Sequence, residues 1–448
     1  MKIKKLLALL MSLTMVISVT ACGDSTDTQS DDKSNDKNTV SEADADTADD
    51  ADTAQEEEKE PVTLTVTTWR EVDSAYYEEI INRFQEAYDW ITVDMVFNSD
   101  ESSYNTNLQA DIGSGTAPDV FDLHTNSTMR TYAQEGVILS QQDMEYMENY
   151  SDAAKVICTF DGENYAYING YNYFGFLYNI DIFEEVGVEI PTTPDEMVDV
   201  VNKLKEAGYG GAVYAGSAYG YNMVRYFAPV IAMGAENFAN MMMGLDDGSI
   251  VDFREIEGLK EGIEAVELYT QENIWYDAYA DIGYEAGISL FASGQSAILY
   301  TGTYLYGEKA TSFPDVNAGF FPIPTYAENG VTYAESAQAT CINAASENIE
   351  AAKLWVNFLA SAEISEYYCT NAKMMSPIEG VEPQFEEAEM LLASSTGYEL
   401  LPVLVYENED YWMTNWKDML KAIMWNGEDF ETLAADMVAF LEDLDLAK

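Results

Sequence analysis

The sequence predicts a mixed α/β protein whose folded part divides into two domains. An alternating segment at Val62–Val66 is followed by helical spacing and then by a second alternating segment, Ile91–Phe97, which together indicate a strand–helix–strand unit. Polar and aromatic residues also gather at the ends of several expected strands. The folded part covers residues 61–448, and chains beyond about 250 to 300 residues usually split into two domains.

The chain begins with a segment typical of a bacterial lipoprotein signal. A basic start precedes an apolar run over residues 6–19, and small residues lead up to Cys22. The run is shorter than the roughly 20 residues that a membrane-spanning helix needs. We therefore interpret residues 1–21 as a signal peptide and Cys22 as the lipidated first residue of the mature protein. An ordinary signal peptide with an incidental cysteine is the alternative.

Residues 22–60 are acidic and polar, and Val40 is their only large aliphatic residue. Such a composition buries too little apolar surface to offset the entropy of ordering. We expect a disordered tether that holds the folded part above a membrane, with an acidic interaction tail as the alternative.

The whole chain has 21 Lys and Arg against 80 Asp and Glu, a formal charge of −59. This charge repels nucleic acid and anionic lipid headgroups, so we expect neither as a partner of the folded part. A neutral or cationic ligand fits better.

His124 is the only histidine, which excludes H-E-x-x-H zinc sites and every metal centre with two imidazoles. The chain has no G-x-S-x-G elbow, P-loop or G-x-G-x-x-G motif, and we expect no metal and no cofactor. A pair of catalytic carboxylates is neither supported nor excluded among so many acidic residues. Cys158, Cys341 and Cys369 are an odd set, expected as buried thiols, although a disulfide between two of them stays open.

The first expected strand ends at Trp69, Arg70 and Glu71, and a helix over residues 77–88 leads to the second strand. Ligands bind at the carboxyl ends of parallel strands, so these three residues are candidates for a binding crevice. A helix around Tyr104 and Leu108 follows. Next comes a short strand whose polar end, with Asp122 and His124, is expected to face the same crevice.

Thr193 and Glu196 form a capping box around Pro194, and the helix they begin ends near Gly208. Later, a helix through Leu290 precedes a strand over residues 297–300, which ends at Thr303 and Tyr304. Residues 341–346 are expected to open a helix that carries Trp355 on its apolar face.

The order of several short motifs resembles the extracellular solute-binding proteins of ABC importers, in the sugar-binding family that includes maltose-binding protein. The motifs are Ser114–Val120, Leu177–Asn179 with Phe183 and Gly187, Pro191–Thr193 with Glu196, Phe291 with Ser293–Gly294, Pro322–Pro324 and Ile342–Ser346.

The resemblance implies a two-lobed periplasmic-binding-protein-like fold, each lobe a mostly parallel sheet flanked by helices, joined by hinge strands. Lobe 1 would comprise residues 61–168 with 325–372. Lobe 2 would comprise residues 169–324 with 373–448.

Sugars offer apolar C–H faces and a fringe of hydroxyls, so their sites need aromatic rings and hydrogen-bonding side chains. Matched by position, the resemblance and the strand ends predict a set of ligand-binding residues: Trp69, Arg70, Glu71, Asp122, His124, Asn172, Tyr221, Thr303, Tyr304 and Trp412, to which we add Trp275 for its place before a loop.

Some of these residues have a structural alternative. Trp412 and Trp416 could share a buried helix face, His124 could be a structural histidine, and Arg70 could pair with Glu71 at the rim.

Together with the lipoprotein signal that ends at Cys22, the resemblance predicts a non-enzymatic, monomeric, lipid-anchored binding protein at the outer face of the cell, which delivers an oligosaccharide to an ABC permease. Three alternatives remain: a binding protein for a peptide or polyamine, a secreted glycoside hydrolase with two carboxylates, and a sensor that hands its solute to a membrane receptor. The identity of the sugar, its linkage and its chain length are not encoded in recognisable motifs.

Overall fold

The structure is a computed structural model that describes residues 59–217, 252–256, 258–326, 333–382 and 427–443, with isolated positions 241, 244, 249, 385 and 422. The chain divides into two units, Met1–Glu58 and Lys59–Lys448. Cys22, the expected signal peptide and nearly all of the expected tether lie outside the described residues, and all that follows concerns the second unit.

The strands are β1 (Val62–Thr68), β2 (Ile91–Phe97), β3 (Val120–Leu123), β4 (Thr159–Phe160), β5 (Glu163–Asn164), β6 (Tyr167–Ile168), β7 (Tyr171–Asn179), β8 (Ile298–Gly302), β9 (Ala318–Phe321), β10 (Tyr333–Ser336) and β11 (Ala339–Ile342). The helices are α1 (Ser74–Ala87), α2 (Glu101–Ser114), α3 (Ser127–Gln134), α4 (Asp152–Cys158), α5 (Ile180–Val186), α6 (Pro194–Glu206), α10 (Leu259–Gln271), α11 (Tyr284–Ala292), α12 (Tyr304–Gly307), α13 (Lys309–Ser312), α14 (Ile349–Leu359), α15 (Ala362–Ala372) and α18 (Phe430–Asp443). Short 3₁₀ turns occur at Glu71–Asp73, Glu145–Glu148, Phe253–Glu255 and Tyr279–Asp281.

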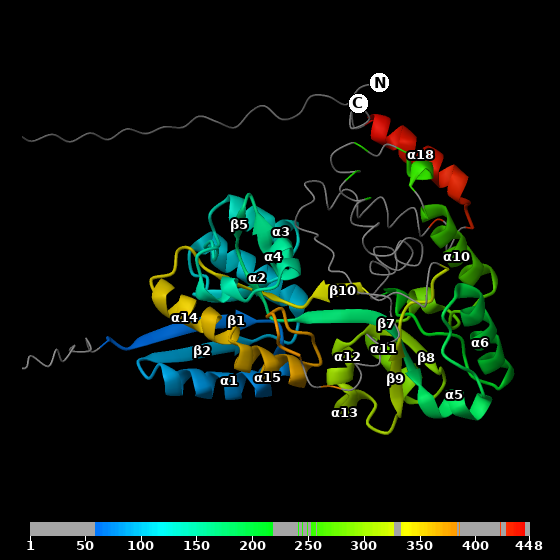
Figure 1. Cartoon of the computed structure of the whole chain (residues 1–448), viewed down its shortest axis with the longest axis horizontal. Coiled ribbons are helices and arrows are strands. Elements are labelled where there is room, and N and C mark those ends of the chain that lie inside the picture. Colours follow the sequence, from blue (N-terminus) through cyan, green and yellow to red (C-terminus); the bar gives the residue numbers. More distant parts are fainter. Residues whose placement is uncertain are drawn as a thin grey trace, which may run out of the picture. The chain divides into compact units, whose positions relative to one another are not determined.

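The first sheet has the strand order β2-β1-β3-β11-β6. β1 runs parallel to β2 and to β3, with α1 as the crossover between β1 and β2, so the predicted strand–helix–strand unit is confirmed. β11 is antiparallel to both β3 and β6. α1, α14 and α15 pack against one another beside this sheet (Figure 1).

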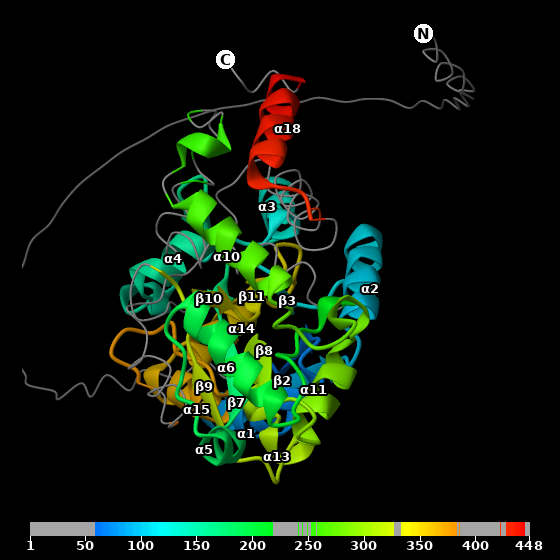
Figure 2. The same ribbon diagram turned by 90° about the vertical axis from the view of Figure 1, so that its right-hand side faces the viewer.

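The second sheet is built around β7, which pairs with β10, β8 and β9. Phe176 and Tyr178 belong to one apolar cluster with residues of α6 and α10, whereas Leu177 belongs to another with residues of α11. A strand buried on both faces needs helices on both sides. α10 in turn packs between α6 and α18 (Figures 1 and 2).

The second sheet differs from the mostly parallel one that the sequence predicts, because all three of these pairings are antiparallel. The chain passes from β6 of the first sheet into β7 over two residues, and β7 then runs antiparallel to β8, β9 and β10. Within the described residues, parallel pairing near this sheet is confined to isolated bridges such as Val213 with Leu299.

Two chain segments cross side by side from one sheet to the other. The N–H of Asn169 donates to the carbonyl of Gln338 at 2.9 Å, and the N–H of Ala337 donates to the carbonyl of Gly170 at 2.9 Å. These four residues, Asn169, Gly170, Ala337 and Gln338, join β6 to β7 and β10 to β11, and we call them the hinge. Figure 1 shows β7 and β10 leaving it together. We call the first sheet with its helices the first lobe, and the second sheet with its helices the second lobe.

The capping box at α6 is present, with the side chains of Thr193 and Glu196 each bonded to the other's backbone N–H, and it is confirmed. The helix expected to open over residues 341–346 is wrong in its start, because Cys341 and Ile342 belong to β11 and α14 begins at Ile349.

Cys158, Cys341 and Cys369 are buried free thiols, as expected. In the described ranges, no helix has both the length and the apolar character needed to cross a bilayer.

Candidate functional site

Strands β1 and β3 bring together two aromatic side chains that the sequence assigned to the site. The parallel pairing of Thr67 with Phe121 places the ends of both strands at one edge of the sheet. The ring of Trp69 lies 4.6 Å from that of His124 and 5.3 Å from that of Tyr104, measured between centroids. Trp69 is only partly buried, so part of its indole is open to solvent.

The Arg70 guanidinium is held by a carboxylate that sequence reasoning missed. Its Nε donates to Asp73 Oδ2 at 2.7 Å and its Nη2 donates to Asp73 Oδ1 at 3.2 Å. The two side chains are 18% and 3% exposed. Arg70 therefore pairs with Asp73, whereas Glu71 is exposed. The alternative salt bridge between Arg70 and Glu71 at the rim is wrong.

Asp73 directly precedes α1 and lies three residues after Arg70, and this spacing is the signal that could have revealed the pair. Burial by itself lowers the pKa of Arg70, but Asp73, Tyr368 and Glu308 raise it above its ordinary value. The guanidinium is thus a permanent positive charge in a largely buried position.

Asp122 is buried inside the first lobe. The Thr340 hydroxyl donates to its Oδ1 at 2.7 Å, and the Tyr104 hydroxyl donates to its backbone carbonyl at 2.7 Å. Burial raises the pKa of this carboxyl to about 6, although hydrogen bonds from Thr68 and Thr340 lower it. Because the carboxylate bonds across strands within the sheet, we withdraw Asp122 as a ligand contact.

His124 stands beside a pocket at the same edge. Its Nε2 lies 2.8 Å from Glu101 Oε1, and this contact is the main cause that lowers the pKa of Glu101. The pocket, of about 250 Å³, lies between α2 and α3. Its lining is mainly polar: Asn105, Thr106, Leu108, Gln109, Leu123, His124, Asn126, Thr128 and Tyr132. Amide and hydroxyl groups in this arrangement suit a hydroxylated ligand.

In the second lobe, Thr303 and Tyr304 directly follow strand β8, and Tyr304 begins α12. Thr303 is buried, and its hydroxyl accepts from the Tyr173 N–H at 3.1 Å, so it joins β8 to β7 and is withdrawn as a contact. Tyr304 is partly buried, with its ring 6.1 Å from Phe174 and 6.5 Å from Tyr284. Tyr304 remains in the candidate set.

Asn172 lies on β7 directly after the hinge, opposite Glu335 of β10. Its side chain is 9% exposed, and its Oδ1 has no hydrogen-bond partner among the described residues. Asn172 also remains in the candidate set.

Trp275 is 1% exposed and packs against the rings of Tyr214, Tyr269 and Tyr279 in the core of the second lobe. Its indole is not open to a ligand, and we withdraw it. Tyr221, Trp412 and Trp416 lie outside the described residues.

Glu308, between α12 and α13, is a second group that the sequence did not single out. Tyr284 donates to its Oε2 at 3.5 Å. Burial raises the pKa of Glu308, Arg70 lowers it, and Glu285 raises it. Over the described residues, no group of three or more His, Cys, Asp or Glu side chains is placed to hold a metal ion.

Comparison with known proteins gives a consistent result. The family described as bacterial extracellular solute-binding protein matches residues 68–366. The chain is 21% identical over 322 residues to the multiple sugar-binding protein of Streptococcus mutans, an alignment that covers 70% of this chain and 75% of that protein.

Two solved structures share the fold. Apo RafE from Streptococcus pneumoniae matches with a TM-score of 0.69 at 19% identity, over 87% of this chain and 99% of RafE. The GacH receptor of Streptomyces glaucescens, studied unliganded and with acarbose, matches with a TM-score of 0.69 at 16% identity, over 86% of this chain and 98% of GacH. The predicted two-lobed α/β fold is confirmed.

Proposed function

Because this chain belongs to the bacterial extracellular solute-binding proteins, we propose that it captures a carbohydrate, in particular an oligosaccharide, between its two lobes and delivers it to the permease of an ABC importer. In the same proposal, Cys22 carries a lipid that anchors the protein to the outer face of the cell, and residues 22–60 form the tether. The protein acts as a monomer. Its lobes correspond to residues 61–168 with 325–372 and 169–324 with 373–448, except that β10 (Tyr333–Ser336) joins the second sheet by pairing with β7.

The observation that carries the carbohydrate proposal is the partly exposed ring of Trp69 at the end of β1, beside the polar pocket at His124. An indole face packs well on the C–H face of a sugar ring, and neighbouring amides and hydroxyls bond its hydroxyl groups. Tyr304 offers a second partly exposed ring from the second lobe. The relatives add support, since their names record multiple sugars, raffinose and acarbose.

We further propose that the protein performs no chemistry on its sugar. Two buried acidic residues near the ends of β1 and β3 have other roles, because Asp73 is bound by Arg70 and Asp122 accepts a hydrogen bond from Thr340. A glycoside hydrolase needs two carboxyl groups that face the scissile bond. Incubation with the best sugar, followed by an assay for new reducing ends, should show none.

The experiment that tests the function is a ligand screen with the purified full chain carrying Cys22→Ser. Thermal unfolding is followed with raffinose, stachyose, maltotriose, xylotriose and chitotriose, and with triglycine and spermidine as non-sugar probes. A ligand at 100 times its Kd stabilises the folded state by about 2.7 kcal/mol, which is a measurable rise in Tm. We expect a rise with at least one oligosaccharide and none with triglycine or spermidine. A rise with the peptide or the amine alone would assign the site to that cargo.

A further inference from the structure

The imidazole of His124 is held by two side chains from different elements of the first lobe. Its Nε2 lies 2.8 Å from Oε1 of Glu101, the first residue of α2. Its ring centroid lies 4.6 Å from that of Trp69, which follows β1, and the two ring planes are inclined by 34°. The side chains of His124 and Glu101 are 39% and 50% exposed, so both can exchange protons with the solvent.

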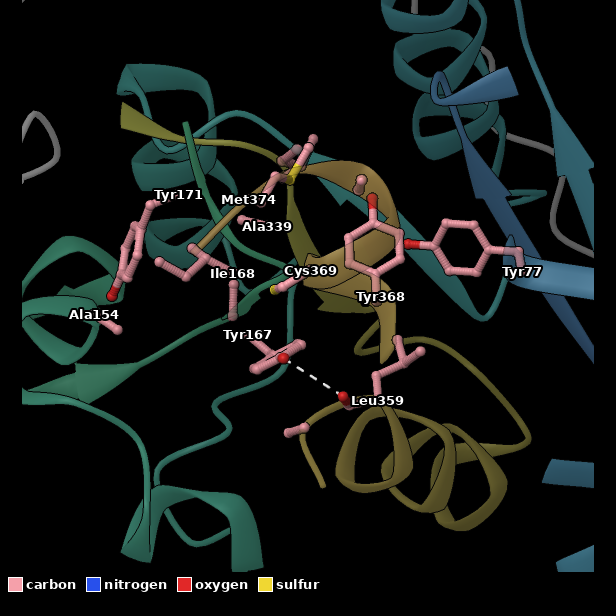
Figure 3. Close-up of a cluster of buried hydrophobic side chains, with 14 of the residues drawn as sticks. Tyr77, Ala154, Tyr167, Ile168, Tyr171, Ala339, Leu359, Tyr368, Cys369 and Met374 are labelled. Atoms are coloured by element: carbon pink, nitrogen blue, oxygen red, sulfur yellow. Dashed lines mark hydrogen bonds between the residues drawn. The ribbon is translucent and has the colours of Figure 1, made fainter. Parts of the chain in front are cut away.

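The backbone beneath His124 is fixed by the first sheet. Leu123, the last residue of β3, pairs with Ala339 of β11, and both residues are buried. Figure 3 shows Ala339 among the buried side chains of this cluster. The main freedom left to His124 is therefore rotation of its side chain, and Trp69 and Glu101 limit that rotation.

Both contacts of His124 become stronger when the ring takes up a proton. A hydrogen bond between two ionised groups is shorter and roughly twice as strong as one between neutral groups. A positive charge close to an indole face is also attracted by the electrons of that ring. The hydrogen bond to His124 is the main cause that lowers the pKa of Glu101 from its ordinary 4.5. Glu101 is thus ionised over the whole range in which a histidine ordinarily titrates, near pH 6.5.

Other charged and titratable groups reach the surroundings of His124 from the end of β1, from α2, from α3 and from β3. Arg70, after β1, is a permanent positive charge that also favours the ionised carboxylate on α2. Tyr104 of α2 and Tyr132 of α3 stay neutral, because burial raises the pKa of both. Burial raises the pKa of Asp122 on β3 to about 6, so this group titrates in the same range as an ordinary histidine and the test must separate its effect.

We propose that Glu101 is a positioning residue that holds His124, as an imidazolium, against Trp69, and that sugar binding therefore weakens as the pH rises and the imidazole loses its proton. The inference rests on the proposed function, because Trp69 is the ring on which the sugar would pack. A neutral imidazole bonds Glu101 more weakly and holds the indole less firmly, so the sugar must order more of its site on binding. Glu101 acts through His124 and not on the sugar itself.

Isothermal titration tests the proposal with the oligosaccharide found in the screen, at pH 5.5 and pH 8, on the full chain with Cys22→Ser. Ion pairs as exposed as this one contribute modestly, so Kd is expected to rise about twofold to fivefold between the two pH values. Glu101→Gln, which keeps the size of the side chain but not its charge, should lose most of this dependence. His124→Gln should lose all of it.

Two variants control for other charged groups. Asp111→Asn removes a negative charge near the other end of α2, roughly 15 Å away along the helix axis and beyond the Debye length of about 8 Å at physiological ionic strength. Asp122→Asn removes the buried carboxyl group of β3. Both variants are expected to keep the pH dependence of the parent chain.

A second measurement uses no ligand. His124 is the only histidine of the chain, so in protein without a histidine tag the imidazole C–H signals of an NMR titration belong to it. Glu101→Gln should lower the pH at which this ring titrates. In the parent chain, the indole N–H signal of Trp69, assigned by its loss in Trp69→Phe, should shift with the same midpoint.

Equal Kd values at the two pH values in the parent chain, or an undiminished pH dependence in Glu101→Gln, would overturn the proposal. So would an imidazole midpoint that Glu101→Gln leaves unchanged. If no sugar binds at any pH, the proposed function fails, while the NMR titration still decides whether Glu101 holds the charged ring.

Discussion

The indole of Trp69 lies against the imidazole of His124, with ring centroids 4.6 Å apart and planes inclined by 34°. His124 is in turn fixed by Glu101, at 2.8 Å, so the aromatic face at the end of β1 is supported from behind. A ring held in one place loses little conformational entropy when a sugar packs on it.

Trp69→Ala is therefore expected to weaken sugar binding at least tenfold, which corresponds to about 1.4 kcal/mol, while Trp69→Phe should weaken it less. Isothermal titration with the oligosaccharide found in the screen measures the change. Trp90→Ala is the matched control, because Trp90 precedes β2 at the opposite end of the parallel strands. Equal losses in both variants would remove Trp69 from the site.

Asp122→Asn should make the protein more stable at pH 7. Burial raises the pKa of Asp122 to about 6 from an ordinary 3.8, so between these values the folded state keeps a proton that the unfolded chain has released. The contribution of Asp122 to the free energy of unfolding hence falls as the pH rises from about 4 to about 6, by about 3 kcal/mol, and the variant escapes that loss.

Urea unfolding of the wild type and the variant at pH 4.5 and pH 7 measures this difference. Asp94→Asn, at an exposed position of β2, is the comparison and should follow the wild type at both values. If Asp122→Asn also follows the wild type, its carboxyl group does not titrate in this window.

Gly170→Ala in the hinge is expected to cost stability. An added Cβ would come within 2.9 Å of Met374 Cβ and 3.1 Å of its Sδ, and relief of such crowding typically costs about 1 to 3 kcal/mol. Gly113→Ala is the control, because nothing lies within 4 Å of its position in α2, and there alanine should be neutral or stabilising. Thermal unfolding of both variants measures the difference, and a Gly170→Ala variant with the Tm of the wild type would show that Met374 moves aside without cost.

Added salt should raise the melting temperature. With 80 acidic residues against 21 basic ones, repulsion between like charges destabilises the compact state. The Debye length falls from about 30 Å at 0.01 M to about 3 Å at 1 M, so this repulsion is screened in the higher range. A scan of Tm against sodium chloride tests it, and a Tm that falls steadily with salt would show that attractive ion pairs dominate.

Several elements in both lobes could be predicted from the sequence because they are locally encoded. β1 and β2 alternate apolar and polar residues, and the capping box of α6 is a local motif. β7 was harder to recognise: eight of its nine residues are buried, so it has no alternation, and its direction depends on how the chain leaves the hinge.

The candidate site was predicted less well, because burial is decided by contacts distant in the sequence. Trp275 and Asp122 have the residue types of a binding site, yet other segments cover them: Tyr214 packs on the first, and Thr340 bonds the second. Asp73 was overlooked although it lies only three residues from Arg70. Glu308 carries no local signal at all, since only the folded chain brings it toward Arg70.

The pairing of β3 with β11 joins strands whose residues, such as Leu123 and Ala339, are separated by most of the second lobe. During synthesis, β3 therefore emerges long before the neighbour that completes its sheet. The first lobe must stay incomplete, with an open strand edge, until the ribosome has passed β11. A helper that shields this edge during export would protect the nascent chain against aggregation.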